Sequence, residues 1–160
     1  MNGLEVLALL RLDQVIRHWE QATVDDWAEV LATFPLFREV SKRKLRKLVQ
    51  SATLAEVAAG QTVLSNGDSS DSLYVILGGT AKALRKPSAR ELGVGDYFGE
   101  LALFDGAPRS ATVVATSELH VIKLPANSAR RLVEQHPAIT LTMLRNLSTQ
   151  LRRHEAQVAR

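Results

Sequence analysis

The chain has 160 residues, of which 46% are hydrophobic, and a formal net charge of +3, so it has enough apolar material for one folded domain and disorder is not expected. It contains no cysteine, which excludes a disulfide framework, a thiolate metal site and a cysteine nucleophile. Charged residues break the apolar start from Leu4 to Ile16, and no uncharged apolar stretch reaches about 18 residues. We therefore expect neither a membrane span nor a signal peptide. We expect the protein to be cytoplasmic.

The N-terminal third of the chain is predicted to be helical. Apolar residues recur at helical intervals over residues 4–20, and Thr23, followed by two aspartates, is a candidate N-cap of a second helix. A Phe-Pro pair interrupts the pattern, and a third helix with a serine N-cap is predicted over residues 41–50. We therefore expect a helical extension over residues 1–33 and one further domain over residues 34–160.

Short apolar runs separated by glycine turns follow over residues 53–124. The predicted strands cover residues 53–57, 62–64, 72–77, 80–84, 90–92, 111–115 and 120–124. Strands of this length and spacing are typical of a β jelly roll, and the fold class is therefore mainly β with flanking helices (α+β). The residues from 85 to 90 leave room only for a short hairpin.

Helical periodicity returns after Pro125. A short helix is predicted over residues 127–135 and a long amphipathic helix from Pro137 to Val158, so that C-terminal helices occupy residues 126–158. A helix of this length at a chain end has little left to pack on. We expect it either to lie across the mouth of the barrel or to pair with a second copy of the chain.

Residues 98–113 form the most informative segment. Gly99 lets the backbone come close to a ligand, because it has no Cβ and reaches positive φ. The next residues, 100–104, favour a short helix whose first N–H groups lack intrahelical acceptors and attract an anion. Arg109 adds a positive charge and Ser110 a hydroxyl donor. These groups together suit a small phosphodiester.

The strings GDYFGELAL at residues 95–103 and PRSAT at residues 108–112 resemble the phosphate-binding cassette of cyclic nucleotide-binding domains, and the resemblance covers about residues 34–155. It implies a jelly-roll domain that binds a cyclic nucleotide, most often cyclic AMP and alternatively cyclic GMP, and passes the event to its flanking helices. Transcription factors of this family carry a helix-turn-helix domain after the long helix. Because the sequence ends at Arg160, we expect no sequence-specific DNA binding.

The cassette chemistry can be assigned to individual residues. The Arg109 guanidinium matches the exocyclic phosphate oxygens, and Glu100 would accept a hydrogen bond from the ribose 2′-hydroxyl. Backbone N–H groups and the Ser110 hydroxyl would complete the phosphate cradle. A surface salt bridge for Arg109, a favourable first-turn position for Glu100 and a strand cap for Ser110 are the simpler alternatives. The predicted site comprises Phe98, Gly99, Glu100, Leu101, Ala102, Arg109, Ser110 and Ala111.

Recognition of the base is less specific in the sequence. Strand alternation after a Gly-Gly turn points Ala83 toward the ribose and base, although a core alanine fits equally well. The family resemblance places a base contact on the long C-terminal helix, near His154. A solvated histidine is the alternative there.

Catalysis finds little support, because the four histidines are scattered and no nucleophile elbow or metal-binding spacing occurs. We predict a non-enzymatic cyclic nucleotide sensor that uses neither a metal nor a cofactor beyond its ligand.

Two other functions stay open. One is a ligand-independent interaction or dimerisation module, with a homodimer through the C-terminal helix or an unidentified protein partner. The other is a nucleic-acid-binding regulator that uses the basic residues of 42–47 and the C-terminal arginines. A solvated helix face is the simpler interpretation of that basic run.

Overall fold

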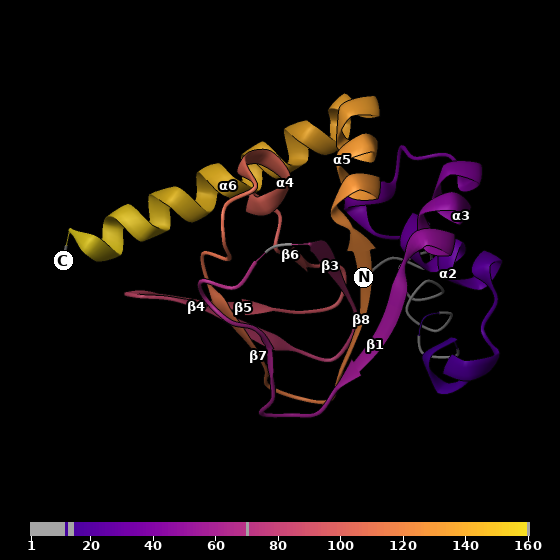
Figure 1. Cartoon of the computed structure of the whole chain (residues 1–160), viewed down its shortest axis with the longest axis horizontal. Coiled ribbons are helices and arrows are strands. Elements are labelled where there is room, and N and C mark those ends of the chain that lie inside the picture. The colour runs from indigo at the N-terminus through magenta and orange to yellow at the C-terminus, as the bar shows by residue number, and fades with distance from the viewer. Residues whose placement is uncertain (1–11, 13–14, 70, 160) are drawn as a thin grey trace, which may run out of the picture.

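The computed structural model describes residue 12 and residues 15–69 and 71–159, which contain two four-stranded antiparallel sheets beside a layer of helices (Figure 1). The first sheet has the strand order β1 (Thr53–Val57), β8 (Leu119–Pro125), β3 (Ser72–Gly78) and β6 (Tyr97–Phe98). The second has the order β2 (Thr62–Leu64), β7 (Thr112–Ala115), β4 (Ala81–Arg85) and β5 (Ser88–Leu92). The predicted class, mainly β with flanking helices, is confirmed.

Strand β3 is buried on both faces. Tyr74 and Ile76 belong to the cluster that fills the space between the two sheets. Leu73, Val75 and Leu77 belong to the second cluster, which joins the first sheet to the helices. A strand covered on both sides requires apolar residues at every position, and this explains the unbroken apolar run instead of an alternating pattern.

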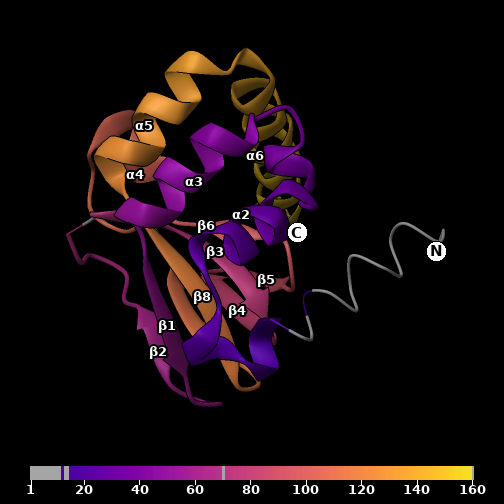
Figure 2. The ribbon, with the colours of Figure 1, turned by 90° about the vertical axis from the view of Figure 1, so that its right-hand side faces the viewer.

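The helices gather over one end of the first sheet, as Figure 2 shows for α2, α3, α5 and α6. The helices of the described part are η1 (Trp19–Gln21), α2 (Val24–Ala32), η2 (Pro35–Phe37), α3 (Lys42–Ser51), α4 (Leu101–Asp105), α5 (Ala126–Gln135) and α6 (Pro137–Val158). Helix α6 leaves this group and extends past the β4–β5 hairpin, with its C-terminal end on the hairpin side (Figure 1). Of the two arrangements expected for the long helix, the structure contains the one across the barrel mouth.

The predicted caps of α2 and α3 are confirmed. The Thr23 hydroxyl accepts a hydrogen bond from the N–H of Asp26 at 3.2 Å, and the Asp26 carboxylate accepts one from the N–H of Thr23 at 2.8 Å. This reciprocal capping box fixes the first turn of α2. The Ser41 hydroxyl accepts a hydrogen bond from the N–H of Lys44 at 3.3 Å, which caps α3.

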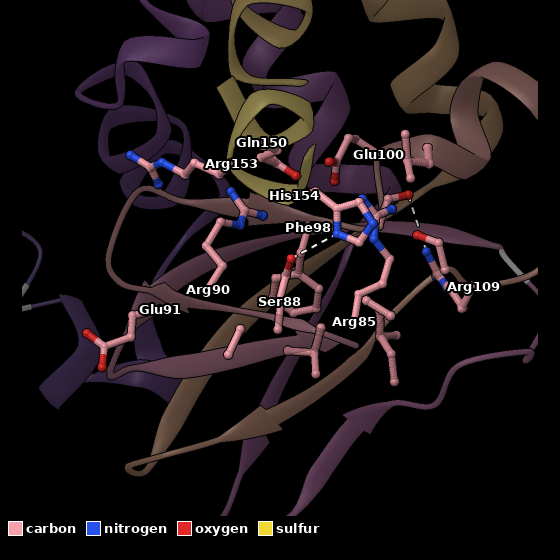
Figure 3. A pocket seen from close by; sticks show the side chains of 18 of the residues that line it. Arg85, Ser88, Arg90, Glu91, Phe98, Glu100, Arg109, Gln150, Arg153 and His154 are labelled. Carbon is pink, nitrogen blue, oxygen red and sulfur yellow. Dashed lines mark hydrogen bonds between the residues drawn. The ribbon is translucent and has the colours of Figure 1, made fainter. Parts of the chain in front are cut away.

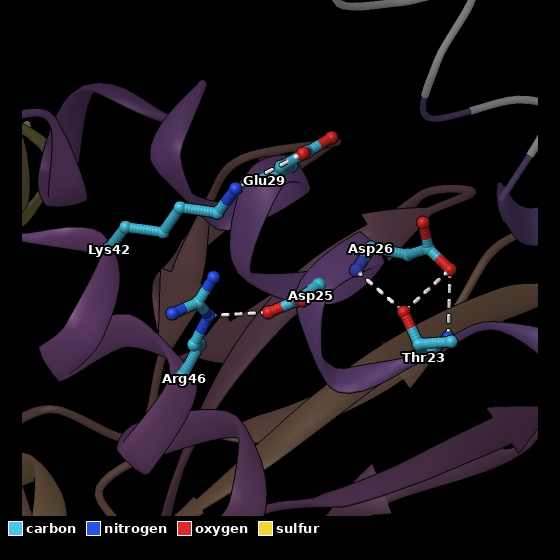
Figure 4. A network of polar contacts seen from close by, with 6 residues as sticks. All are labelled: Thr23, Asp25, Asp26, Glu29, Lys42 and Arg46. Atoms are coloured by element: carbon cyan, nitrogen blue, oxygen red, sulfur yellow. Dashed lines mark hydrogen bonds and ion pairs between the residues drawn. The ribbon is translucent and has the colours of Figure 1, made fainter.

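Part of the basic run on α3 is used within the molecule (Figure 4). Lys42 lies 3.3 Å from the carboxylate of Glu29, and Arg46 donates to the carboxylate of Asp25, so both cations meet the acidic face of α2. These pairs are exposed and each contributes at most about 1 kcal/mol. These two pairs account for Lys42 and Arg46 of the basic run within the molecule itself.

Several element boundaries differ from the prediction. β6 was not predicted, because two residues between glycines carry no periodicity and their pairing partner, β3, is distant in the sequence. β5 begins at Ser88, two residues early, so the predicted short hairpin is confirmed as a two-residue turn. The helix predicted over 4–20 falls mainly on residues outside the described part. No helix within the described part is long and apolar enough to cross a membrane.

Candidate functional site

A cavity of about 350 Å³ opens between the second sheet, the start of α4 and the last turns of α6 (Figure 3). This volume lies within the range of about 300–1,000 Å³ that is typical of small-molecule sites. Nine of the ten residues predicted from the sequence line it: Ala83, Phe98, Gly99, Glu100, Leu101, Arg109, Ser110, Ala111 and His154. The side chain of Ala102, the tenth, lies outside the part of the chain that the structure describes. The structure therefore brings the two parts of the cassette and the two expected base contacts to one place.

Arg109 is a buried charged group of the cavity wall, with 4% of its side chain exposed. Its guanidinium donates to the carbonyl oxygen of Ser72 at 2.8 Å and to that of Gly99 at 3.3 Å. The carboxylate of Asp71 lies 3.9 Å away and is itself largely exposed. A guanidinium has five N–H donors, so donors remain for an anion in the cavity.

Gly99 holds the backbone in a conformation that other residues rarely adopt. Its φ is +86°, and a Cβ at this position would collide with Nη1 of Arg109 and lie 3.1 Å from the carbonyl oxygen of Ser72. The glycine therefore has two functions, because it permits the turn into α4 and leaves room for the arginine.

Leu101, the first residue of α4, lines the cavity. Its N–H group has no acceptor among the described residues, whereas that of Leu103 bonds to the carbonyl of Glu100 at 3.0 Å. Unsatisfied donors at the first turn of a helix favour an anion. The Ser110 hydroxyl likewise has no hydrogen-bond partner among the residues that the structure describes, and Ser110 lines the same cavity.

Glu100 is buried beside these donors, with 5% of the residue exposed. Burial raises the pKa of its carboxyl group above the ordinary value of 4.5. A hydrogen bond from its own backbone and the charges of Arg90, Arg85 and Arg109 oppose this rise. The carboxylate is therefore a desolvated acceptor, which a ligand hydroxyl can satisfy.

Helix α6 closes the cavity through two groups of contacts. The Ser88 hydroxyl, at the start of β5, shares a hydrogen bond of 2.9 Å with Nδ1 of His154 and donates to the side chain of Gln157. Nearer the middle of the helix, Asn146 donates to the Tyr97 hydroxyl at 2.7 Å. His154 therefore lies over the cavity, in the place that the family resemblance implies, and its bond to Ser88 connects the helix to the second sheet.

The sequence reasoning missed the polar lining residues that come from the β4–β5 hairpin and from α6: Arg85, Ser88, Arg90, Glu91, Gln150, Arg153 and Gln157. With Arg109, four arginines face two glutamates around the cavity, so its charge favours an anionic ligand. One signal was available, because Gln150, Arg153, His154 and Gln157 recur at helical spacing and mark a polar stripe on α6.

A separate cluster lies on the first sheet, outside the cavity. Nε2 of His120 is 3.2 Å from the carboxylate of Glu56, its cross-strand partner, and 3.9 Å from that of Glu118. The three side chains could hold a metal ion by their spacing alone. They also form an ordinary ion-pair group whenever His120 is protonated.

Comparison with protein families matches residues 54–136 to the cyclic nucleotide-binding domain. The chain belongs to this family. The matched residues run from β1 to the end of α5 and include the cassette of this cyclic nucleotide-binding domain, whereas α6 lies beyond them.

The relatives of the chain include a transcriptional regulator, potassium channels and regulatory subunits of a protein kinase. The chain is 30% identical over 137 residues to the CRP-like cAMP-activated global transcriptional regulator of Mycobacterium tuberculosis, covering 82% of this chain and 61% of that protein. It is 32% identical over 106 residues to the cAMP-dependent protein kinase regulatory subunit of Aspergillus niger, covering 64% of this chain and 26% of that one. The chain thus spans less than two thirds of the length of these relatives.

A solved structure of PKAR CBD2 bound to Sp-2Cl-cAMPS matches with a TM-score of 0.73, over 82% of this chain and 91% of that chain. At 22% identity, this likeness shows the common fold.

Replacing Gly99 by alanine is expected to destabilise the protein more than the same change at Gly60. Both glycines have nearly the same φ, +86° and +85°, and both pay the cost of a left-handed alanine, about 1–2 kcal/mol. Only at Gly99 does the added Cβ meet other atoms, because nothing lies within 4 Å of the Gly60 position. Urea unfolding of both variants measures the difference. Equal losses would contradict the close approach of Arg109 to Gly99.

The raised pKa of Glu100 predicts a pH-dependent effect of Glu100→Gln. The carboxyl group is neutral in both states below its ordinary pKa of 4.5, and its burial becomes costly as the pH rises through the higher folded-state pKa. The free energy of unfolding of Glu100→Gln, relative to the parent protein, should therefore increase from acidic to neutral pH. Unfolding curves at several pH values test this, with the exposed Glu91→Gln as the control. A difference that stays constant with pH would refute it.

Proposed function

We propose that the cavity binds one cyclic mononucleotide, with cyclic AMP as the ligand and cyclic GMP as the alternative. The observation that carries the proposal is the pair of buried, oppositely charged residues Arg109 and Glu100 in one cavity. The guanidinium would bind the exocyclic phosphate oxygens, together with the first N–H groups of α4 and the Ser110 hydroxyl. Glu100 would accept a hydrogen bond from the ribose 2′-hydroxyl.

The remaining walls suit a sugar and a base. Ala83, Phe98 and Ala111 offer small or apolar surfaces, and His154 lies on the helix that closes the cavity. One negative charge, a sugar hydroxyl and a flat base match the three parts of the cavity in turn. A ligand of this kind fits the family to which the chain belongs.

We propose a regulatory role without catalysis. Binding would draw the loop of residues 99–109 and the end of α6 toward the ligand, and the change in α6 would be the output. Such a response requires the ligand to bind more tightly to the protein with α6 in one position than with α6 in another.

We further propose that the protein is cytoplasmic and that residues 1–33 form an extension of the domain at 34–160. The described helix of that extension, α2, shares the core cluster with α3 and α5.

A second candidate function is association of two copies through α6. Leu141, Leu144, Leu151 and Val158 are 48–61% exposed and follow one another at intervals of three and seven residues. Heptad spacing of apolar residues is typical of a helix that pairs with another helix. The nucleic-acid alternative has less support, since two of the basic side chains on α3 are paired with α2.

Calorimetric titration with each nucleotide tests the proposed ligand. We expect binding of at least one of them, and a loss of about 2–4 kcal/mol of binding free energy in Arg109→Ala, because one partner of a charged pair is removed. Arg109→Lys should fall between the two, since it keeps the charge and loses the planar fork. Arg131→Ala, on the exposed side of α5, is the control. No heat with either nucleotide at millimolar concentration would rule the proposal out.

Association through α6 predicts a change of mass in Leu144→Lys. A charge in the apolar stripe should turn a dimer into a monomer in sedimentation experiments, whereas Thr149→Lys adds the same charge outside the stripe and should leave the dimer intact. A parent protein that stays monomeric at every concentration would exclude this function.

A further inference from the structure

Arg109 carries a buried charge, and no carboxylate of the described residues lies within hydrogen-bonding distance of its guanidinium. Among the described residues, the nearest carboxylate belongs to Asp71, at 3.9 Å, and 81% of the Asp71 side chain is exposed. A desolvated cation is costly unless other groups stabilise it. The carbonyl groups of Ser72 and Gly99 supply two acceptors, at 2.8 and 3.3 Å. A third group in contact with the guanidinium is an aromatic ring.

The ring belongs to Tyr74 on β3. The central carbon of the Arg109 guanidinium lies over it, 5.7 Å from the ring centroid. An aromatic face attracts a cation electrostatically within about 6 Å, and the attraction is stronger where water is excluded. Tyr74 is 7% exposed, so this contact lies in a closed environment.

The sheet fixes the ring in place. In the strand register, Tyr74 is opposite Phe98 on β6 and opposite Lys123 on β8. The Tyr74 and Phe98 rings are stacked, with centroids 5.0 Å apart and an angle of 4° between their planes, and the Lys123 ammonium lies 5.5 Å from the Tyr74 centroid. Neighbours on both adjacent strands therefore hold the ring, and the ring offers Arg109 a rigid surface.

We propose that Tyr74 is a positioning residue for the ligand site: its ring holds the Arg109 guanidinium at the cavity wall in the orientation that binds an anion. This inference rests on the proposed function for its consequence in binding. Tyr74 does not line the cavity, so it acts through Arg109. The ring supplies attraction without using an N–H donor, and the donors not bonded to Ser72 and Gly99 stay available for the ligand.

The test changes the electrostatics of the ring at nearly constant size. Position 74 receives phenylalanine and then phenylalanine with one, two and three ring fluorines, which progressively remove negative charge from the ring face. The affinity for cyclic AMP is measured by calorimetry for each protein. We expect Tyr74→Phe to bind within a small factor of the parent protein and each added fluorine to weaken binding stepwise. Tyr74→Leu, which has no ring, should bind about 2- to 30-fold more weakly.

A second readout needs no ligand. The urea midpoint of unfolding should fall along the fluorine series when Arg109 is present and should not follow the series in an Arg109→Met background. The same fluorinated residues at Phe37, which is buried among the helices away from the cavity, are the control and should leave affinity unchanged.

The outcomes separate the two proposals. A parent protein that binds neither nucleotide, but whose stability follows the fluorine series only with Arg109, would refute the proposed function and support the contact of Tyr74 with Arg109. If the parent protein binds the nucleotide and the affinity stays the same across the fluorinated variants at position 74, the positioning role is overturned. A stability series that is the same with and without Arg109 would overturn the contact itself.

Discussion

The desolvated charge of Arg109 is the constraint on which the cavity depends. Its acceptors come from two separate segments, Ser72 at the start of β3 and Gly99 at the turn into α4, and one cation therefore ties both to the loop that precedes β7. Only glycine fits the turn, since a side chain there would occupy the space of the guanidinium. Among the described residues, the fold supplies two carbonyl groups and an aromatic ring, whereas the carboxylate of Asp71 lies 3.9 Å away and is largely exposed. A negative charge in the cavity would complete this arrangement.

Glu100 places the opposite charge next to the same turn. Its burial raises the pKa of its carboxyl group, while a hydrogen bond from its own backbone and the charges of Arg90, Arg85 and Arg109 oppose this rise. The cavity wall therefore contains both a hydrogen-bond acceptor, Glu100, and a cation, Arg109. A ligand that has both a hydroxyl group and a phosphate could satisfy both groups at once.

Local signals predicted most of the fold. The caps at Thr23 and Ser41, the strands at 53–57 and 62–64 and the helix from Pro137 to Val158 agree with the structure because a few neighbouring residues determine each of them. The strand at Tyr97–Phe98 and the approach of Arg85 and Arg90 to the cavity could not be predicted in this way, because they depend on pairing and packing between distant segments. Gly99, Glu100 and Arg109 could be grouped from the sequence because they lie within a dozen residues, and the structure places all three at one cavity.

Helix α6 connects the cavity to the exposed apolar stripe. Gln150, Arg153, His154 and Gln157 face the cavity, while Leu144 and Leu151 are exposed on the same rigid rod. A tilt of α6 on the cavity side must therefore also move its exposed apolar stripe. The helix is already held by the bonds of His154 to Ser88 and of Asn146 to Tyr97, so a ligand changes its position only by replacing or strengthening these contacts. Because Tyr97 directly precedes Phe98 and Gly99 in the chain, the Asn146 contact joins α6 to the segment that carries Gly99. A movement of the turn at Gly99 would therefore be passed directly to α6.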